Sequence, residues 1–365
     1  MSRNDAFRIA VFPGDGIGHE VMNAALAVLK AVQQRVGGFT LEYEHLPGGA
    51  ETYRDTGVAL SDEALKSAGE ADAILFGAMG LPAVRYPDGT EIAPQLDMRF
   101  HFELYAGVRP IKALPGGFLA LRDPRAEAID LVLIRESTEG LFAARGKGVV
   151  EDDSIARDTM VITRAVCERL FDFAFRLAER RKTQGRPGKV TCVDKANVFT
   201  SMAFFRKIFD ERAKQFQNIS AEHHYVDATA LDLVRRPWDF DVMVTENMFG
   251  DILSDLGAAL IGGMGMAPSA DIGDEHALFQ PAHGSAPDIA GQGIANPIAM
   301  IQSSAMMLDW LAERHAIESC AEAAQLMDNA VAQVLAAGQV RPTDLGGNDG
   351  TERIAGAIIE MVTRV

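Results

Sequence analysis

Apolar and polar positions along the chain form two kinds of pattern. Short apolar runs, typical of buried strands, alternate with longer stretches whose apolar residues are three or four positions apart, as in amphipathic helices. The predicted strands are 7–12, 71–76, 105–110, 131–135, 189–193 and 241–245. The predicted helices are 19–35, 159–181, 299–311 and 321–336. This alternation predicts an α/β fold, with a ligand site where charged residues follow the strand ends.

The composition limits the class of protein. At 365 residues, 48% of them hydrophobic, the chain can bury a large core, and its length suggests two domains. The net charge is −16 and basic residues do not cluster with aromatics, so we expect no nucleic-acid partner. No apolar run approaches the roughly 20 residues of a membrane helix, so we expect no membrane partner either. Three cysteines without CxxC spacing favour a reduced, cytoplasmic protein.

The strongest chemical signal is a pair of carboxylates in the segment TENMFGDILSDLGAAL. Asp251 and Asp255 are four residues apart among apolar residues, so they would project from one face of a helix. A solvated helix face would explain an arbitrary pair of this kind. Here the glycines of 257–265 and the strand 241–245 suggest that buried backbone lies beside the pair. A hard divalent cation would offset the repulsion of the two acids, so we interpret them as half of a metal site.

Three arginines suggest how an acidic ligand would be held. Arg109 and Arg135 end apolar strands, and Arg99 precedes the first of them in MRFHFELYAGVRP. A surface position would explain Arg99 alone. A charge at the end of a buried strand needs a partner, and guanidinium groups pair bidentately with carboxylates. Converging arginines therefore suit a di- or tricarboxylate.

A lysine and a further carboxylate are candidates for proton transfer. Lys195 follows a predicted strand in VDKANV, where it is either a surface charge or a group that moves a proton. Asp227, in YVDATA, has aromatic and apolar neighbours and could be a metal ligand or a proton relay.

Two glycine-containing loops are harder to interpret. Residues 14–18, GDGIG, lie between a strand and a helix, but their spacing does not fit GxGxxG, and a tight turn explains them. Residues 281–297 are rich in small residues, which would let backbone approach a ligand closely, and Asp288 would suit a ribose diol. A mobile glycine loop explains this second segment equally well.

These motifs together resemble the β-decarboxylating dehydrogenases of 2-hydroxy acids, the family of isopropylmalate, isocitrate, homoisocitrate, tartrate and D-malate dehydrogenases. The overall sequence pattern is most similar to that of the 3-isopropylmalate dehydrogenases. The resemblance extends over nearly the whole chain. It is carried by PGDGIGHE, LDMRFHFELYAGVRP, IRESTEG, VDKANV, YVDA, TENMFGDILSD, HGSAPDIAGQGIANP and DLGGNDGTE.

The resemblance implies a two-domain α/β clamshell with a mixed sheet running through both domains, and not a Rossmann fold. Residues 1–105 plus 262–365, with both chain ends, would form the larger, NAD-binding domain. Residues 106–261 would form the smaller domain, with the metal and substrate residues and the dimer interface. The protein would be a homodimer with shared active sites, acting on a small 2-hydroxy di- or tricarboxylate.

The resemblance also implies a role for each matching position. Lys195 and Asp227 would be catalytic and would come from the partner subunit. The ligands of Mg²⁺ or Mn²⁺ would be Asp227, Asp251 and Asp255. The substrate-binding residues would be Arg99, Arg109, Arg135, Gln95 and Leu96. The NAD-binding residues would be His283, Gly284, Ser285, Ala286, Pro287, Asp288 and Asn296. Asp288 stands where NADP-using relatives carry lysine, and its carboxylate would repel a 2′-phosphate, so we expect NAD.

Three positions depart from the family pattern. Phe142 occupies the position of the family's catalytic tyrosine, which is credited with protonating the enol after CO₂ leaves, and a phenyl ring has no proton to donate. Gln280 stands where isopropylmalate enzymes usually have glutamate. The substituent-reading residues Ala93, Gln95 and Leu96 match neither the isopropylmalate nor the isocitrate pattern.

Three functions follow as alternatives. The first is NAD- and metal-dependent oxidation, with decarboxylation, of a 3-substituted malate such as 3-isopropylmalate. The second is a tartrate- or D-malate-type dehydrogenase, with or without decarboxylation. The third is a non-catalytic regulatory paralogue, which is disfavoured because the costly charges remain in place. These charges belong to Lys195, Asp227, Asp251 and Asp255.

Overall fold

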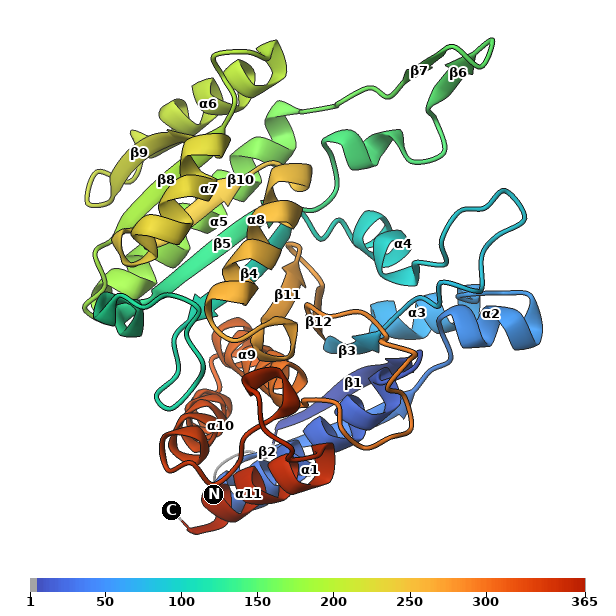
Figure 1. The fold of residues 1–365 in the computed structure, drawn as a ribbon, viewed down its shortest axis with the longest axis vertical. Helices are drawn as coiled ribbons and strands as arrows, with labels where there is room; N and C mark the ends of the chain where they lie inside the picture. Colours follow the sequence, from blue (N-terminus) through green and yellow to red (C-terminus); the bar gives the residue numbers. More distant parts are fainter. Residues whose placement is uncertain (1–4, 365) are drawn as a thin grey trace.

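A single ten-stranded sheet runs through the molecule in the computed structural model, which describes residues 5–364 (Figure 1). Its strand order is β2-β1-β3-β12-β11-β4-β5-β10-β8-β9. These strands are β1 (Asp5–Gly14), β2 (Phe39–His45), β3 (Ala73–Ala78), β4 (Ala106–Lys112), β5 (Asp130–Glu136), β8 (Lys189–Asp194), β9 (Ser220–Tyr225), β10 (Val242–Thr245), β11 (Pro268–Ile272) and β12 (Ala277–Pro281). The sheet is mixed, as expected from the family resemblance.

The strand direction changes in the middle of the sheet. Strands β12, β11, β4 and β5 pair antiparallel with one another, and the outer pairs are parallel. Parallel neighbours need long crossover connections, which here contain helices. The helices are α1 (Gly18–Val36), α2 (Ala50–Thr56), α3 (Asp62–Glu70), α4 (Pro94–His101), α5 (Arg164–Thr183), α6 (Thr200–Ala213), α7 (Val226–Arg235), α8 (Asn247–Leu260), α9 (Ile298–His315), α10 (Glu318–Ala336) and α11 (Thr351–Arg364). Short 3-10 helices are η1 (Pro124–Ala128), η2 (Leu141–Ala144), η3 (Pro237–Asp239), η4 (Met264–Met266) and η5 (Thr343–Leu345).

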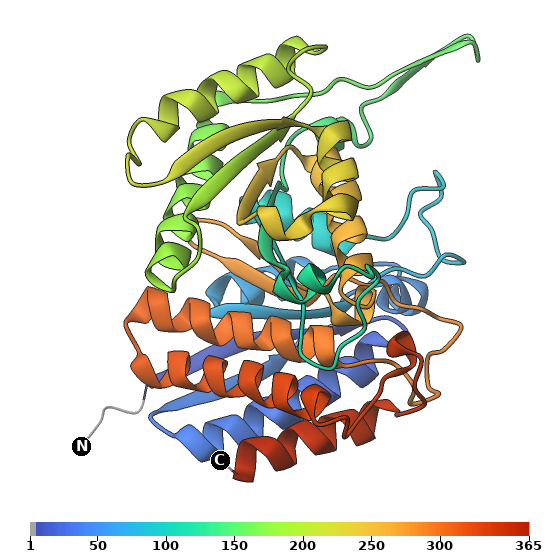
Figure 2. The ribbon, with the colours of Figure 1, turned by 60° about the vertical axis from the view of Figure 1, so that its left-hand side comes forward.

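The two faces of the sheet are covered differently. On one face a single hydrophobic core joins α1, α9, α10 and α11 with α5 and α6 (Figure 2). On the other face there are two separate cores, one beneath α3 and α4 and one beneath α7 and α8. Buried charged side chains lie between these two cores, on β4, β5 and β11. The candidate site therefore lies between the two cores on this face of the sheet.

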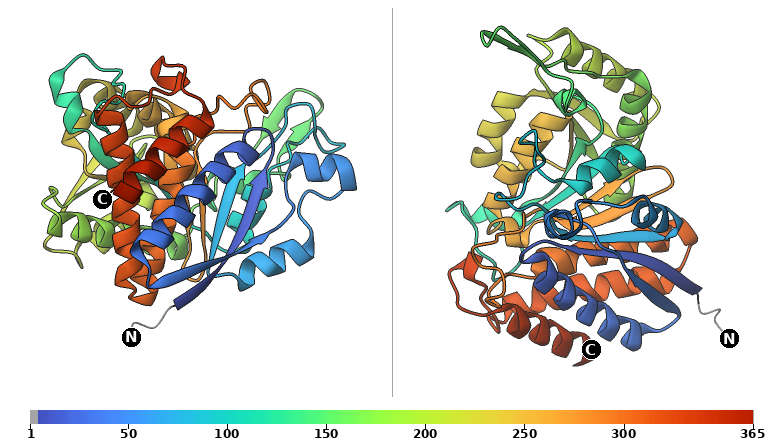
Figure 3. Two further views of the ribbon diagram at one scale, coloured as in Figure 1. Left: turned by 90° about the horizontal axis from the view of Figure 1, so that it is seen from below. Right: turned by 90° about the vertical axis from the view of Figure 1, so that its right-hand side faces the viewer.

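Both ends of the described chain lie in the same half of the molecule, where α11 packs against α1 (Figure 3). The division into residues 1–105 plus 262–365 and residues 106–261 stays a prediction, and residues 1–4 lie outside the described part. None of the helices within residues 5–364 is long and apolar enough to cross a membrane.

A hairpin of β6 (Val149–Glu151) and β7 (Ile155–Arg157) extends away from the rest of the molecule (Figures 1 and 2). Its side chains are exposed, including Val149, Val150 and Ile155. Exposed valine and isoleucine on a short, isolated hairpin form an apolar surface that nothing in the single chain covers.

The predicted elements agree with the observed ones within a few residues, with one clear error. The helix predicted from residue 159 begins at Arg164, because Thr163 caps it: the Thr163 Oγ1 atom accepts a hydrogen bond from the Val166 backbone N–H at 3.4 Å. The residues before the cap are extended, and Val161 forms a bridge with Gly140. The apolar spacing before residue 163 therefore belongs to extended chain.

Candidate active site

The three arginines predicted to bind carboxylates converge at the centre of the sheet. Arg109 lies on β4 and Arg135 on β5, and the register pairs Gly107 of β4 directly with Arg135. Opposite residues of an antiparallel pair share a face, and so do residues two apart on one strand, so Arg109 and Arg135 project to the same side. Arg99 approaches from α4, and all three side chains are buried. The structure thus confirms that the three arginines lie together.

Asp271, on β11, is the counter-ion of two of these arginines, and the sequence analysis did not identify it. Arg99 Nε donates to Asp271 Oδ2 at 3.0 Å, and Arg109 Nη2 donates to Oδ1 at 3.2 Å. Gln280 Nε2 also donates to Oδ2, at 2.9 Å. The available signal was an aspartate inside the apolar run PSADI, because a charge buried in a strand requires a partner.

Burial governs the electrostatics of this cluster. It lowers the pKa of Arg109, and, with repulsion from Arg99, it lowers the pKa of Arg135 to about 10. Burial alone would raise the pKa of Asp271, but the charges of the three arginines outweigh it and hold that pKa below its usual value. At neutral pH Asp271 is therefore ionised and Arg135 is protonated.

Arg135 connects the sheet to α8. Its Nε and Nη2 atoms donate to Asn247 Oδ1 at 2.9 and 2.7 Å, and its Nη1 atom is paired with Asp251 Oδ1. A β-carbon at Gly250 would lie 2.7 Å from Arg135 Cβ, so only glycine lets the helix approach this closely. Glu246 caps the helix by accepting hydrogen bonds from the Phe249 and Met248 backbone N–H groups.

Asp251 and Asp255 project from one face of α8, as predicted, but that face is exposed rather than next to buried backbone. Leu253 and Gly257 face the core, which turns the two acids and Ile252 outward. The Asp251 side chain is 51% exposed although it pairs with Arg135. Burial and the charge of Asp251 together raise the pKa of Asp255. Two carboxylates one helical turn apart are suitable oxygen ligands for Mg²⁺ or Mn²⁺.

The third predicted metal ligand lies elsewhere in the chain. Among residues 5–364, no three His, Cys, Asp or Glu side chains converge as a metal site. Asp227, in the first turn of α7, is instead paired with Lys195, whose Nζ lies 2.6 Å from Asp227 Oδ1. This hydrogen bond is the main cause of the lowered pKa of Asp227. In the single chain the carboxylates of α8 and the Lys195–Asp227 pair are therefore separate from each other.

Hydrogen bonds fix the residue that precedes Lys195. Asp194, the last residue of β8, is buried and accepts hydrogen bonds from Arg206 Nε and Nη2, both at 2.7 Å. Its Oδ1 atom also accepts from the Ala196 backbone N–H at 2.8 Å. Lys195 is thereby held at the end of its strand, where sheets of this class bind ligands.

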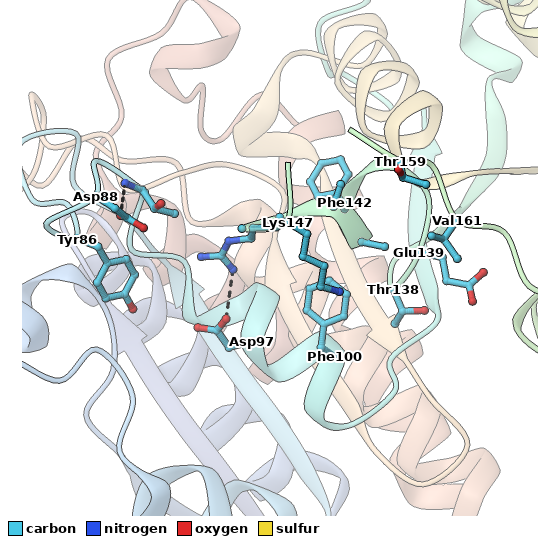
Figure 4. A pocket seen from close by; sticks show the side chains of 15 residues that line it. Tyr86, Asp88, Asp97, Phe100, Thr138, Glu139, Phe142, Lys147, Thr159 and Val161 are labelled. Atoms are coloured by element: carbon cyan, nitrogen blue, oxygen red, sulfur yellow. Dashed lines mark hydrogen bonds and ion pairs between the residues drawn. The ribbon is translucent and has the colours of Figure 1, made fainter. Parts of the chain in front are cut away.

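A cavity of about 930 Å³ adjoins the arginine cluster (Figure 4). Phe142, on η2, lines it and also lies 5.0 Å beneath the guanidinium group of Arg135. In Figure 4, Tyr86 lies on one side of Phe142 and Phe100, and Thr138, Glu139 and Val161 lie on the other. The three arginines do not line this cavity, so Phe142 is the residue that contacts both the cavity and the arginine cluster.

The predicted substituent-reading residues lie on α4. Gln95 and Leu96 precede Arg99 by four and three residues, which places them on the same side of the helix. Both are half-buried, and Gln95 Oε1 is buried without a hydrogen-bond partner among the described residues. A buried carbonyl oxygen of this kind is available to accept a hydrogen bond from a ligand.

The segment predicted to bind NAD is a loop between β12 and α9, packed on the 14–18 turn. The Ile17 backbone N–H donates to Ser285 O at 2.9 Å, and a β-carbon at Gly16 would lie 2.2 Å from that same oxygen. The close packing explains the glycine turn without a cofactor role. Ala286 has a φ of +36°, a conformation that alanine rarely adopts.

The polar side chains of this loop differ in whether they have hydrogen-bond partners. His283 Nε2 is buried without a partner in the described part of the chain, and burial lowers the pKa of His283. Gly284, Pro287 and Asp288 are exposed. Asn296 is buried and accepts a hydrogen bond from the Ile298 backbone N–H at 3.1 Å, so it also supports the start of α9. An unpartnered imidazole beside exposed small residues fits a dinucleotide ligand.

Comparison with known proteins gives a consistent result. The family described as isocitrate/isopropylmalate dehydrogenase matches residues 8–361. A 3-isopropylmalate/3-methylmalate dehydrogenase of Methanocaldococcus jannaschii is 44% identical over 356 residues, covering 97% of this chain and 98% of that protein. A homoisocitrate dehydrogenase of the same organism is 40% identical over 365 residues, covering 98% of each. A solved isocitrate dehydrogenase from Methylococcus capsulatus has a TM-score of 0.86 and 36% identity, covering 98% of this chain and 99% of that one.

Proposed function

Because the chain belongs to the isocitrate/isopropylmalate dehydrogenase family, and is therefore an oxidoreductase acting on a hydroxy acid, we propose that it oxidises a 3-substituted malate such as 3-isopropylmalate. NAD would accept the hydride, and Mg²⁺ or Mn²⁺ would be the metal. The observation that carries this proposal is the convergence of three buried arginines beside the two carboxylates of α8. Membership of the family confirms the resemblance and the fold class predicted from the sequence.

The arginines would position the substrate. Arg99, Arg109 and Arg135 would bind its carboxylates, which places the 2-hydroxyl towards α8. Gln95 and Leu96, on the same side of α4 as Arg99, would contact the substituent on C3. Gln95 offers a free acceptor and Leu96 an apolar surface, so a small substituent that is partly polar fits as well as an alkyl group.

The donor set fits a divalent cation held between two subunits. Asp251 and Asp255 would supply two oxygen ligands, and Asp227 of a second copy would supply the third. When bound, the cation would lower the pKa of the 2-hydroxyl as a Lewis acid. Lys195, which lies 2.6 Å from Asp227, would accept the hydroxyl proton in its neutral amine form.

Exposed apolar side chains support a homodimer with shared active sites. Leu231, Val234 and Ile252 are about half exposed or more on the packed pair α7 and α8, and the β6–β7 hairpin adds further exposed valines. The α7 and α8 surface lies beside Asp227 and the α8 carboxylates, the two halves of the proposed shared site. A dimer formed through α7 and α8 would bury them and bring Lys195 and Asp227 of one subunit to α8 of the other.

The cofactor would lie on the loop that contains His283, Ser285 and Asn296. Asp288 has an exposed carboxylate that accepts no hydrogen bond from the described residues, so it can accept from the ribose hydroxyls of NAD. The same charge would repel the 2′-phosphate of NADP. We therefore favour NAD.

Phe142 favours a second candidate. Its ring lies at the arginine cluster but has no proton to give, so decarboxylation of a β-keto acid would lack the family's usual donor. A tartrate- or D-malate-type dehydrogenase, with little or no decarboxylation, is therefore the alternative.

A screen of 2-hydroxy diacids with NAD and Mn²⁺ tests the proposal. The expected result is NADH formation with a 3-substituted malate and one CO₂ trapped for each NADH. Turnover of tartrate or D-malate with less than one CO₂ for each NADH would favour the second candidate. Absence of NADH with every diacid of the panel would overturn both.

A further inference from the structure

Asp271 gives the arginine cluster a resident counter-charge. Its carboxylate is fully buried, at 0% exposure, and is shared by Arg99 and Arg109. Arg135, the third arginine, is directed instead to Asn247 and Asp251. All three groups that would bind the substrate are therefore already paired with a carboxylate of the protein, and two of them share Asp271.

The register of the sheet and one glycine hold Asp271 in this position. Asp271 of β11 lies opposite Gly107 of β4, which in turn lies opposite Arg135 of β5. A β-carbon at Gly107 would meet Ser137 Oγ at 2.6 Å and Asp271 Oδ1 at 3.1 Å. The absence of a side chain at residue 107 therefore leaves the space that the carboxylate occupies. The sheet register and the missing side chain at residue 107 thus fix the Asp271 carboxylate beside the arginines, which indicates that it belongs to the site.

The charges in the buried cluster can be counted. Arg99 and Arg109 carry two positive charges against the one negative charge of Asp271, while Arg135 is paired with the half-exposed Asp251. In the proposed function Asp251 would bind the cation and release Arg135, which leaves two positive charges for a ligand with two carboxylates. A third carboxylate would find no free cation in the cluster and would be repelled by Asp271. The adjoining cavity contains Arg145, which is paired with Asp97, and Lys147, which is exposed.

We propose that Asp271 sets the number of carboxylates that the site accepts, so that dicarboxylates are bound in preference to tricarboxylates. This inference rests on the proposed function, in which the arginines hold the substrate. Asp271 acts through Arg99 and Arg109 and is a positioning and specificity residue. It takes no part in proton or hydride transfer.

The Asp271→Asn substitution tests the proposal, because the amide oxygen can still accept from Arg99 and Arg109 while the charge is lost. Calorimetry on the full-length protein would compare succinate with propane-1,2,3-tricarboxylate. We expect the ratio of tricarboxylate to dicarboxylate association constants to rise about tenfold, as expected for one unit charge removed at close range in the interior. A ratio that stays constant while both constants fall would show a structural role alone and would overturn the proposal.

A charge-swap variant separates charge from position. In Asp271→Asn/Gln280→Glu, the carboxylate moves to a side chain that is hydrogen-bonded to Asp271 in the wild type, at 2.9 Å. The count of charges is restored, so we expect the ratio to return to within about threefold of the wild-type value. This variant keeps the arginines paired, so it remains informative if Asp271→Asn does not fold. A ratio that instead rises tenfold in the swap variant would contradict the proposal.

A control substitution removes one negative charge from the same β11–β12 hairpin. Glu275 is 80% exposed and pairs with Arg314, so Glu275→Gln should leave the ratio unchanged. A rise in the ratio equal to that of Asp271→Asn would show a general effect of net charge and would also overturn the proposal. These measurements use anions without NAD or metal, so they test Asp271 even if no hydroxy diacid is oxidised.

Discussion

The arginine cluster and the outer face of α8 differ although they are in contact through the Arg135–Asp251 pair. In the cluster, Arg99 of α4 and Arg109 of β4 are buried and share Asp271, which the register of β4, β5 and β11 holds in place. On α8 the carboxylates of Asp251 and Asp255 are exposed, and no third His, Cys, Asp or Glu among residues 5–364 joins them as a metal ligand. One chain is thus sufficient to form the anion site, but the proposed cation site requires a second.

This difference has a physical cause. Buried charges must be satisfied for the chain to fold, so the cluster is complete in the single chain. Exposed carboxylates are already solvated, so the chain can fold before a ligand or a partner subunit binds them. Substitutions in the cluster should therefore reduce stability, whereas substitutions on α8 should reduce activity alone.

The largest expected effect concerns the shared site. Lys195→Met and Asp255→Asn should each lower kcat by about 10²- to 10⁴-fold, since each removes one group from the proposed chemistry. In a mixed dimer one site carries both substitutions and the other carries neither. Random co-expression of the two variants should therefore restore about a quarter of the wild-type activity.

The control for this experiment is Lys207→Met on α6, whose side chain is 65% exposed and pairs only loosely, at 4.0 Å, with Glu211 on the same helix. It should retain full activity. Failure of the two inactive variants to complement each other would show that the site is not shared between subunits.

A smaller effect should appear in stability. Arg109→Gln leaves Asp271 with one arginine fewer in a fully buried site, so we expect the free energy of unfolding to fall by about 3–5 kcal/mol. Asp255→Asn, which only relieves repulsion from Asp251 on an exposed face, should leave it unchanged within about 0.5 kcal/mol. Urea unfolding of both variants gives the comparison. Equal losses in the two would contradict the distinction between the regions.

Phe142 lies at the border of the two regions, and Phe142→Tyr should change the fate of the product. A hydroxyl at the edge of the arginine cluster can protonate an enol, so decarboxylation should become at least about tenfold faster relative to oxidation if it is slow in the wild type. Trapped CO₂ measured against NADH reports this. An unchanged ratio would show that another group already supplies the proton. Phe100→Tyr, on the same cavity, is the matched control and should leave the ratio unaltered.

The smallest effect is expected at the exposed cofactor loop. Asp288→Asn should raise kcat/KM for NADP relative to NAD by about fivefold, because an exposed charge contributes at most about 1 kcal/mol. Steady-state kinetics with both cofactors is sufficient. Equal use of NADP and NAD by the wild type would remove the role given to Asp288.

Much of the site could be predicted from residues whose local pattern is distinctive. Arg135 lies next to the end of β5, and Asp251 and Asp255 have helical spacing, so their placement follows from short-range geometry. Arg109, predicted to end its strand, lies instead in the middle of β4, because the strand continues to Lys112 by pairing with β5. Asp271 was missed because a single acid in a five-residue strand has no periodicity to mark it. The start of α5 was misplaced because the cap at Thr163 outweighed the apolar spacing before it.

The sequence by itself determined the α/β class, the family and the candidate catalytic and binding residues, because strand and helix periods and motif spacing are local properties of the chain. Tertiary structure alone decided which charges are paired. The antiparallel register of β4, β5 and β11 brings Asp271 between Arg99 and Arg109, and the packing of α8 at Gly250 leaves Asp251 and Asp255 outside the core. Pairing and burial depend on residues far apart in the sequence, so no local pattern could reveal them.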